Sequence, residues 1–257
     1  MKKYLIATFA GLMALTVTTA QEYKVTKSTG KLVINLSSVK VEGYSGTEII
    51  FTNDRENKDQ DERAKGLHPI NGSGLIDNTN LGINVNDKGG TIEVSQVSSR
   101  DNKIKIKVPK GMAVSYTYSR TMDAGKSSFK DLDGELEIST QYNGVELENV
   151  TGPMTVKVVY GNIEAKFKDN MKGPISIVSI YGHVDVALPT TAKANLTMKT
   201  SYGEILASGD LKIDIEKNTN SEMVSYSNNN VKGKLNGGGT ELSLKSDYSK
   251  IYLRKAN

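Results

Sequence analysis

The chain has 257 residues, a formal net charge of +4 and no cysteine. The lack of cysteine excludes disulfide bonds, thiolate metal sites and a lipid-modified N-terminal cysteine, and the near balance of 33 basic and 29 acidic residues disfavours nucleic-acid binding. Tryptophan is absent, tyrosine is the main aromatic residue and glycine is abundant, a composition typical of short strands joined by tight turns.

The first twenty residues have the features of a secretory signal peptide. Lys2 and Lys3 form a basic start, residues 4–17 are apolar and uncharged, and Ala20 ends a run of small residues suited to cleavage. The apolar run is shorter than a transmembrane span requires. We therefore expect a signal peptide at residues 1–20 and an extracytoplasmic mature chain, periplasmic, secreted or at the cell surface. We expect no transmembrane segment and no lipoprotein anchor.

Residues 21–110 form an irregular, β-rich N-terminal part. Apolar and polar residues alternate in KLVINL, GGTIEVSQV and NKIKIKVPKG, and each stretch predicts a strand with one buried face. A highly charged stretch occupies residues 53–66 between them. It lacks the turn glycine and the terminal glutamate of a calcium loop, so we expect an exposed loop.

Residues 111–257 contain a repeat centred on tyrosine. The tyrosines recur every 18 to 24 residues, and each is followed by glycine, asparagine or serine: Tyr142, Tyr160, Tyr181, Tyr202, Tyr226 and Tyr248. A period near twenty predicts a stack of coils, each of which is one supersecondary unit. The unit of Tyr226 departs from the pattern, and we expect its preceding residues to bulge as an insertion.

Apolar residues alternate on both sides of each tyrosine. In the first unit, Leu136 and Ile138 stand six and four positions before the tyrosine, and Val145 and Leu147 stand three and five positions after it. Each coil is therefore predicted to be a strand, a tyrosine corner, a second strand and a return of variable length. The small residue after the tyrosine is expected to let the backbone turn.

Several segments resemble a known family, namely KIKVPKGMAVSYTYS, YNGVEL, YGNIEA and YGHVDVALPTTAKANLTMKTSYGEI. They are similar to the bacterial "putative adhesin" family of uncharacterised secreted or envelope β-helix repeat proteins, over roughly residues 30–255. The resemblance implies an all-β fold, a right-handed parallel β-helix-like solenoid, outside the cytoplasm. It supplies no catalytic residues.

The aligned tyrosines are the candidate ligand-binding residues. Tyr160, Tyr181 and Tyr202 would form a ladder along one edge of the stack. Such rings either bind sugars or a partner surface, or stack on one another and shield the edge of the core. The expected partner is an envelope glycan or a surface protein, and the oligomeric state stays open.

Three carboxylates share the position four residues after the tyrosine, Glu146, Glu164 and Asp185. Stacked like charges repel, so this acidic row either binds a cation or a basic ligand, or is neutralised by neighbours such as Lys166. The two histidines, His68 and His183, do not form a pair at ligand spacing. We expect no metal site and no cofactor.

The sequence therefore predicts a non-catalytic binding or scaffold module with an unknown ligand. The alternative is a carbohydrate-active enzyme, a polysaccharide lyase or hydrolase, in which two carboxylates of the acidic row meet a basic residue in one groove. A third hypothesis is end-to-end assembly through unpaired terminal coils. The charged tail YLRKAN argues against it, because charged residues on an edge strand discourage pairing.

Overall fold

The structure, a computed structural model, describes residues 21–53, 62–64, 66–98, 103–121, 124–216 and 229–256. Three predicted features lie wholly or largely outside the described residues: the signal peptide at residues 1–20, the charged stretch at residues 53–66 and the unit of Tyr226. The described part contains 21 strands and one short 3-10 helix, η1 (Glu62–Ala64). The prediction of an all-β chain is confirmed.

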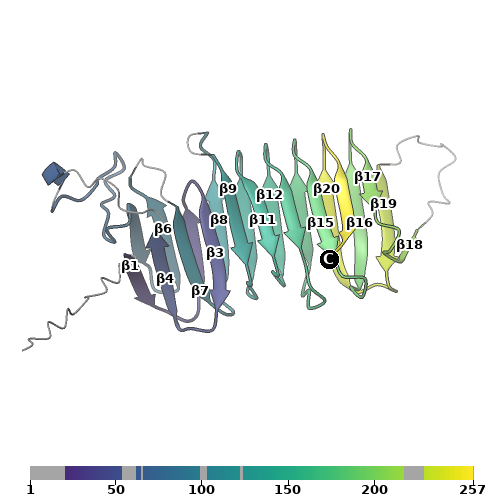
Figure 1. Cartoon of the computed structure of the whole chain (residues 1–257), viewed down its shortest axis with the longest axis horizontal. Helices are drawn as coiled ribbons and strands as arrows, with labels where there is room; N and C mark the ends of the chain where they lie inside the picture. The colour runs from purple at the N-terminus through teal and green to yellow at the C-terminus, as the bar shows by residue number, and fades with distance from the viewer. Residues whose placement is uncertain are drawn as a thin grey trace, which may run out of the picture.

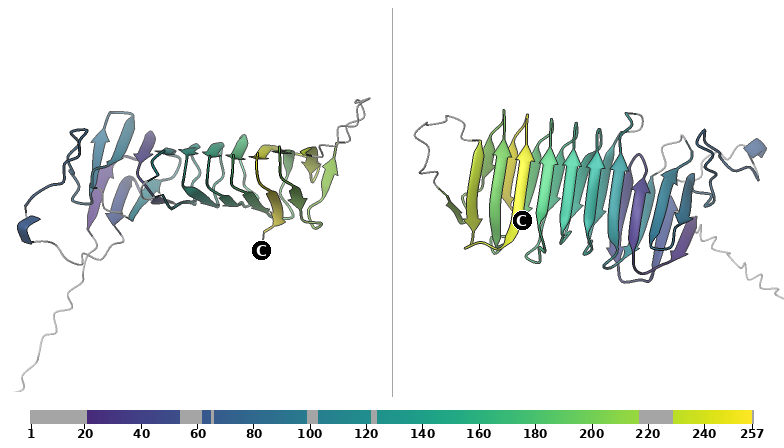
Figure 2. Two further views of the ribbon diagram at one scale, coloured as in Figure 1. Left: turned by 90° about the horizontal axis from the view of Figure 1, so that it is seen from above. Right: turned by 180° about the vertical axis from the view of Figure 1, so that it is seen from behind.

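The strands form two sheets that face each other along an elongated molecule (Figures 1 and 2). The ten-stranded sheet runs, from edge to edge, through β1 (Glu22–Thr26), β4 (Glu48–Asn53), β7 (Ile104–Pro109), β3 (Val39–Tyr44), β9 (Lys126–Lys130), β11 (Gly144–Glu148), β13 (Ile163–Lys166), β15 (Val184–Leu188), β21 (Ile251–Lys255) and β17 (Ile205–Ala207). The eleven-stranded sheet runs through β18 (Ile213–Ile215), β19 (Asn230–Leu235), β16 (Ala194–Thr200), β20 (Thr240–Ser246), β14 (Ile175–Ser179), β12 (Met154–Val158), β10 (Leu136–Thr140), β8 (Ala113–Tyr118), β2 (Lys31–Asn35), β6 (Thr91–Gln96) and β5 (Ile83–Asp87).

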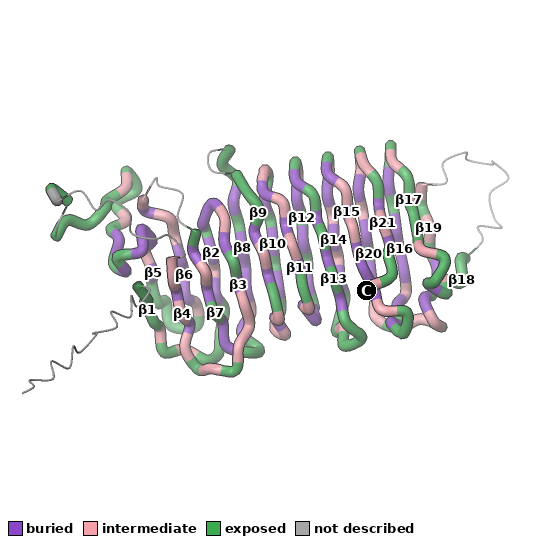
Figure 3. The backbone as a smooth tube through the Cα atoms, viewed as in Figure 1, coloured by how far each residue is buried: buried purple, intermediate pink, exposed green. Residues whose placement is uncertain are grey.

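Each coil from β10 onward in the repeat places one strand in each sheet, and the two strands are joined by a tyrosine corner. β10 continues into β11, β12 into β13 and β14 into β15, and every strand pairs in parallel with its equivalent in the next coil. This register keeps equivalent residues level, so Ile138, Val156 and Ile177 stand in one row. Their side chains are buried in the core, because alternate residues of a strand point to opposite faces. Figure 3 shows this alternation as buried and exposed positions that follow one another along the strands. The inward positions predicted for these three coils are confirmed.

The last coil does not lie at the end of the stack. β20 and β21 stand between the coil of β14 and β15 and the coil of β16 and β17, in parallel with both. In Figure 1 these yellow strands lie among green ones. We call residues 240–255 the inserted coil, and the place that it fills the slot. The order of units in space therefore differs from their order along the chain.

The position of the inserted coil changes which strand forms the edge. β21 is an internal strand, so the expectation that the tail YLRKAN protects an edge is wrong. The ten-stranded sheet ends at β17, and among the described residues no strand pairs with the outer side of β17. For the same reason Ile205 is only half-buried and Ala207 is exposed, although their positions in the repeat predict burial.

The N-terminal residues extend the same two sheets. β2 and β3 pair in parallel with β8 and β9, and β6 and β7 add one more parallel strand to each sheet. The strands beyond them, β5 on one sheet and β4 and β1 on the other, are antiparallel. One core runs through the whole molecule, from Phe51 on β4 to Leu235 on β19.

A buried polar cluster lies inside the first tyrosine corner. The Tyr116 hydroxyl is fully buried and donates a hydrogen bond to the carbonyl oxygen of Ser37 at 3.2 Å. It accepts hydrogen bonds from the Ser127 hydroxyl at 3.0 Å and from the Asn143 amide at 2.7 Å. Burial raises the pKa of Tyr116 to about 12, and these two hydrogen bonds oppose that rise in part.

We expect Tyr116 to weaken the fold at high pH. In the unfolded chain the phenol ionises near its ordinary pKa of 10.0, whereas in the folded chain it stays protonated up to about pH 12. The contribution of Tyr116 to the free energy of unfolding is therefore complete below pH 10.0 and is lost as the pH rises towards 12. The loss amounts to about 1.4 kcal/mol per pH unit in that window. Denaturant titrations across this range should show a steeper decline for the wild-type chain than for Tyr116→Phe. Equal slopes would contradict the prediction.

Candidate functional site

The tyrosine corners rest on buried hydroxyl side chains. Two positions before Tyr181, the Ser179 hydroxyl accepts a hydrogen bond from the Gly182 N–H at 3.0 Å and donates one to the carbonyl oxygen of Gly161 in the neighbouring coil at 2.9 Å. Thr200 makes the equivalent pair of bonds in its own coil, at 2.9 and 3.2 Å. These bonds tie the corners of Tyr181 and Tyr202 to neighbouring corners and hold these tyrosines in register, whereas the corner of Tyr160 has Val158 in the equivalent position.

Glycine follows the tyrosine because neighbouring corners approach closely. A Cβ atom on Gly182 would lie 2.0 Å from the carbonyl oxygen of Gly161, and one on Gly203 would lie 1.8 Å from that of Ser249. None of these glycines has a positive φ. Lack of space, rather than a special backbone conformation, therefore explains glycine at this position.

Among the described residues, five tyrosine rings form one continuous stack, which we call the tyrosine ladder. In spatial order its members are Tyr142, Tyr160, Tyr181, Tyr248 and Tyr202, with ring centroids 4.9 to 5.3 Å apart and planes within 13° of parallel. The three predicted site residues all belong to it, but Tyr202 does not touch Tyr181. The ring of Tyr248, from the inserted coil, stands between them.

Sequence reasoning included Tyr142 and Tyr248 in the repeat but not among the candidate site residues. Their identical place beside the corner was the available signal. What the sequence did not reveal is that Tyr248 joins the two halves of the ladder, because this depends on where the inserted coil lies.

The ladder exposes ring edges rather than ring faces. Tyr160, Tyr181 and Tyr248 are each sandwiched between two rings and are still 55, 50 and 53% exposed. With both faces covered, the solvent-accessible part is the edge with its hydroxyl group. Tyr202 is 76% exposed, and among the described residues only one ring stacks on it. Its outer face is therefore open.

The predicted acidic row exists and carries its own counter-ions. Glu146, Glu164 and Asp185 are neighbours in register on the outer face of the ten-stranded sheet. Lys126 binds the carboxylates of both Glu146 and Glu164, the latter at 3.1 Å. The hydrogen bond with Glu146 is the main cause that raises the pKa of Lys126. Two of the three carboxylates are thus bridged by one ammonium group.

The third carboxylate of the row pairs with the inserted coil. The Arg254 Nε atom donates a hydrogen bond to Asp185 at 2.7 Å, and this bond raises the pKa of Arg254. Lys166, the expected neutralising neighbour, makes neither contact. Two cations therefore offset most of the charge of the three carboxylates. This is close to the second of the two arrangements that the sequence left open, with Lys126 and Arg254 in place of Lys166.

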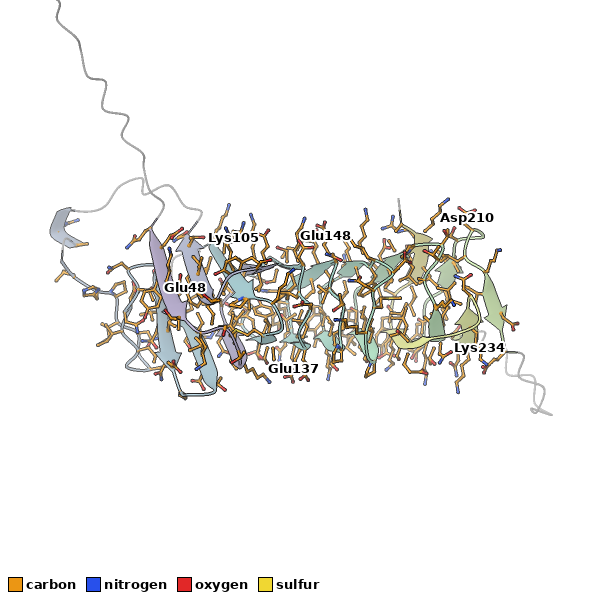
Figure 4. The ribbon with its side chains drawn as sticks, turned by 90° about the horizontal axis from the view of Figure 1, so that it is seen from below. Glu48, Lys105, Glu137, Glu148, Asp210 and Lys234 are labelled. Atoms are coloured by element: carbon orange, nitrogen blue, oxygen red, sulfur yellow. The ribbon has the colours of Figure 1, made fainter. Side chains whose placement is uncertain are left out.

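Charged side chains line the outer faces of both sheets (Figure 4). Lys105 and Glu148 project from the ten-stranded sheet, and Glu137 and Lys234 project from the eleven-stranded sheet. Many of these charges form ion pairs, such as Glu148 with Lys130 at 3.0 Å. Exposed pairs of this kind contribute about 0–1 kcal/mol each, so they tune solubility and register more than stability.

A row of varied polar residues runs beside the ladder, two positions after each tyrosine. It holds His183, Lys250 and Glu204, and the Lys250 ammonium lies 2.8 Å from the Glu204 carboxylate, which lowers the pKa of Glu204. The His183 ring packs edge-on against Tyr252 at 5.9 Å. The other histidine, His68, is exposed in the N-terminal part.

Metal-binding groups do not gather in the part of the chain that the structure describes. Within it, no three aspartate, glutamate or histidine side chains come close enough together to hold a metal ion. Among the same residues, no helix has the length and the apolar character that crossing a membrane requires.

Residues 119–235 match the family described as Toastrack DUF4097. The matched segment is a little under half of the chain and is similar to that family. This match confirms the resemblance to an uncharacterised "putative adhesin" family. The matched segment carries four members of the tyrosine ladder, Tyr142, Tyr160, Tyr181 and Tyr202. The inserted coil with Tyr248 begins five residues beyond the matched segment.

Two solved structures are similar to the chain over most of its length. One is described as a putative cell adhesion protein from Clostridium sporogenes ATCC 15579, with 16% identity, a TM-score of 0.46 and coverage of 93% of this chain and 100% of that one. The other is described as a putative adhesin from Bacteroides fragilis NCTC 9343, with 11% identity, a TM-score of 0.35 and coverage of 92% and 97%. No curated protein matches the chain.

Proposed function

We propose that the chain is a non-catalytic, extracytoplasmic binding module whose ligand surface is the tyrosine ladder. The observation that carries this proposal is the continuous stack of five tyrosines, four of which are at least half exposed. Tyrosine edges combine apolar carbon with a hydroxyl group, a combination that is common at protein interfaces.

The proposal includes a right-handed parallel β-helix-like solenoid as the scaffold. A connection between parallel strands of one sheet is right-handed in about 98% of cases. The coils that link β10 to β12 and β12 to β14 are connections of this kind. The predicted signal peptide at residues 1–20 supports placement outside the cytoplasm, and the lack of cysteine removes any dependence on an oxidising or reducing compartment.

The ladder geometry restricts how a glycan or a surface protein can bind. Stacking of a sugar ring requires a free aromatic face, and in the ladder the inner rings cover one another. Among the described residues, the two end rings, Tyr142 and Tyr202, each have one stacked neighbour, and Tyr202 is the more exposed, so a sugar can stack on its outer face. The three inner rings offer hydroxyl groups and edges at intervals of about 5 Å. A partner that bridges several of these hydroxyl groups fits the surface better than a single sugar does.

We expect replacement of the predicted ladder residues to reduce binding. The Tyr160→Ala/Tyr181→Ala/Tyr202→Ala variant should bind envelope fractions or an arrayed glycan at least tenfold more weakly, a difference of about 1.4 kcal/mol. The matching triple phenylalanine variant keeps the ring edges and loses the hydroxyl groups, so its affinity separates the two contributions. Tyr252→Ala, on the outer face of β21 and outside the ladder, is the control and should bind as the wild type does.

Two results would contradict the proposal. If the folded triple alanine variant kept full binding to the same glycan or envelope fraction, the ladder would be structural only. If the wild-type chain shortened a polysaccharide, the non-catalytic role would be wrong, and Glu146 and Glu164 would be the first carboxylates to replace.

A further inference from the structure

The slot is a complete binding site for a two-stranded segment. On the eleven-stranded sheet, β20 pairs with β16 over seven residue pairs and with β14 over five. On the ten-stranded sheet, β21 pairs with β15 over five residue pairs and with β17 over three. β14 and β16 do not pair with each other, and neither do β15 and β17. Without the inserted coil, four strand edges would face an empty gap.

Side chains make the slot specific for this segment. Leu242, Leu244, Ile251 and Leu253 are each at most 1% exposed and fill the core at this level. Tyr248 stacks on a ring at either side, and the buried Ser246 hydroxyl donates a hydrogen bond to the carbonyl oxygen of a corner glycine, Gly182, at 2.9 Å.

Charges fix the register of the inserted coil from both sides of the slot. Arg254 pairs with Asp185 on one side, and Lys250 pairs with Glu204 on the other. A segment shifted along the slot would lose both pairs and would also place polar residues in the core, because a shift by one residue turns a strand over. The two ion pairs and the alternation of inward residues therefore favour one register of the inserted coil in the slot.

A short turn joins the inserted coil to β19, the strand before it in the chain. Leu235 and Thr240 both lie opposite Ala194 of β16, on its two sides, so residues 236–239 must pass around this strand. Neighbouring strands are about 4.8 Å apart, which makes the two ends about 10 Å apart. Asn236, Gly237 and Gly238 all have a positive φ, as a tight turn with little side-chain bulk requires.

We propose that the slot also accepts the inserted coil of a second copy of the chain, so that copies associate by exchanging residues 240–255. Every contact that holds the coil is made to residues that a second copy presents identically. On one side of the slot, β14 and β15 end more than fifty residues before the inserted coil begins. Their contacts with the coil are therefore long-range contacts, which the coil of a second molecule can make in the same way.

The length of the turn decides which arrangement forms. In one molecule the turn keeps the coil beside its slot at an effective concentration in the millimolar range, and insertion within the molecule dominates in dilute solution. Removal of Gly237 and Gly238 leaves three steps between Leu235 and Thr240, which extend at most about 11 Å. That length cannot pass around β16, whereas an exchanged coil that continues away from its own molecule remains possible.

The first experiment uses the chain that lacks Gly237 and Gly238. We expect it to form folded dimers or longer assemblies at a concentration where the wild type is monomeric, measured by light scattering after size-exclusion chromatography. A folded, strictly monomeric deletion variant would overturn the proposal, because the coil would then fill its own slot despite the shortened turn.

Cysteine pairs identify the surface that joins the copies. Ser176 and Ser243 are partners in register on neighbouring strands, within the range of a disulfide, and the chain has no other cysteine. One copy carries Ser176→Cys and the other carries Ser243→Cys, both with the shortened turn. Exchange predicts a disulfide between the two copies after oxidation. Dimers without this disulfide would overturn the proposal, because association would then use another surface, such as the outer edge of β17.

The same pair tests the proposal if the shortened chain does not fold. Full-length copies with Ser176→Cys and Ser243→Cys are unfolded together, refolded at increasing concentration and oxidised. We expect the fraction of disulfide-linked dimer to rise at least tenfold between micromolar and millimolar chain concentration. The control is Thr155→Cys mixed with Ser176→Cys, which are also partners in register but lie outside the inserted coil. Equal cross-linking in both mixtures would overturn the proposal.

Discussion

Replacement of Leu244 by alanine will lower the free energy of unfolding by about 2–5 kcal/mol, the range for a leucine removed from a packed core. Leu244 is 1% exposed and stands between Ile177 and Met198 in register, so its loss leaves a cavity in the middle of the stack. Its neighbours are held by strand pairing on both sides and have little freedom to close the cavity. Denaturant unfolding of the two purified chains measures the difference.

Ile205→Ala provides the matched comparison for this prediction. Ile205 occupies an inward position of the repeat but lies on the edge strand β17 and is only half-buried, so its replacement should be less harmful. If the coils followed the order of the sequence, Leu244 would lie in the terminal coil and Ile205 in an internal one. The ranking of the two variants would then be reversed, which makes the pair a direct test of the inserted coil.

Replacement of Gly182 by alanine will destabilise the fold by about 3 kcal/mol, because a new methyl group in a fully packed site forces the backbone to move. The added Cβ would lie 2.0 Å from the carbonyl oxygen of Gly161, and this oxygen already accepts the hydrogen bond of Ser179. Relief of the clash therefore separates two coils and breaks the bonds that align the tyrosines. Thermal unfolding followed by circular dichroism measures the loss.

Gly209→Ala is the control for Gly182→Ala. A Cβ atom on Gly209 meets nothing within 4 Å, and its φ is not positive, so the substitution should leave stability within about 0.5 kcal/mol of the wild type. The tyrosine ladder provides a second measurement. Displaced coils should also alter the near-ultraviolet signal of the stacked tyrosines in Gly182→Ala. If Gly182→Ala were as stable as Gly209→Ala, lack of space between neighbouring corners would not be the reason for glycine at position 182.

Much of the fold could be predicted because each coil repeats the same local pattern. Alternation of apolar and polar residues has a period of two in a strand, and this identified Leu136, Ile138, Val145 and Leu147 as inward residues, all of which are buried. The tyrosine corners were predicted for a similar reason: the same short motif recurs at intervals close to the length of one coil. The acidic row followed from the same alignment.

The counter-ions of the acidic row were harder to predict. Lys126 comes before the first aligned carboxylate, in the coil of β9, which has no tyrosine corner of the repeated kind. Arg254 reaches Asp185 only because β21 pairs with β15, although 69 residues separate the two. Contacts between residues so far apart in the sequence depend on which coils are neighbours in the stack. A repeated pattern does not specify the order in which the coils stack.

By itself, the sequence determined the strands, their buried faces, the tyrosine corners and the residues that each coil presents to solvent. These properties depend on residues that are close together along the chain. The alternation of apolar and polar residues and the residue types at the turns are sufficient to predict them. Only the tertiary structure decided the order of the coils, the place of Tyr248 between Tyr181 and Tyr202, and the edge at β17. The physical reason is that all coils have the same inward pattern and register, so any coil can stack on any other. The choice is made by connections, ion pairs and hydrogen bonds that act across the whole chain.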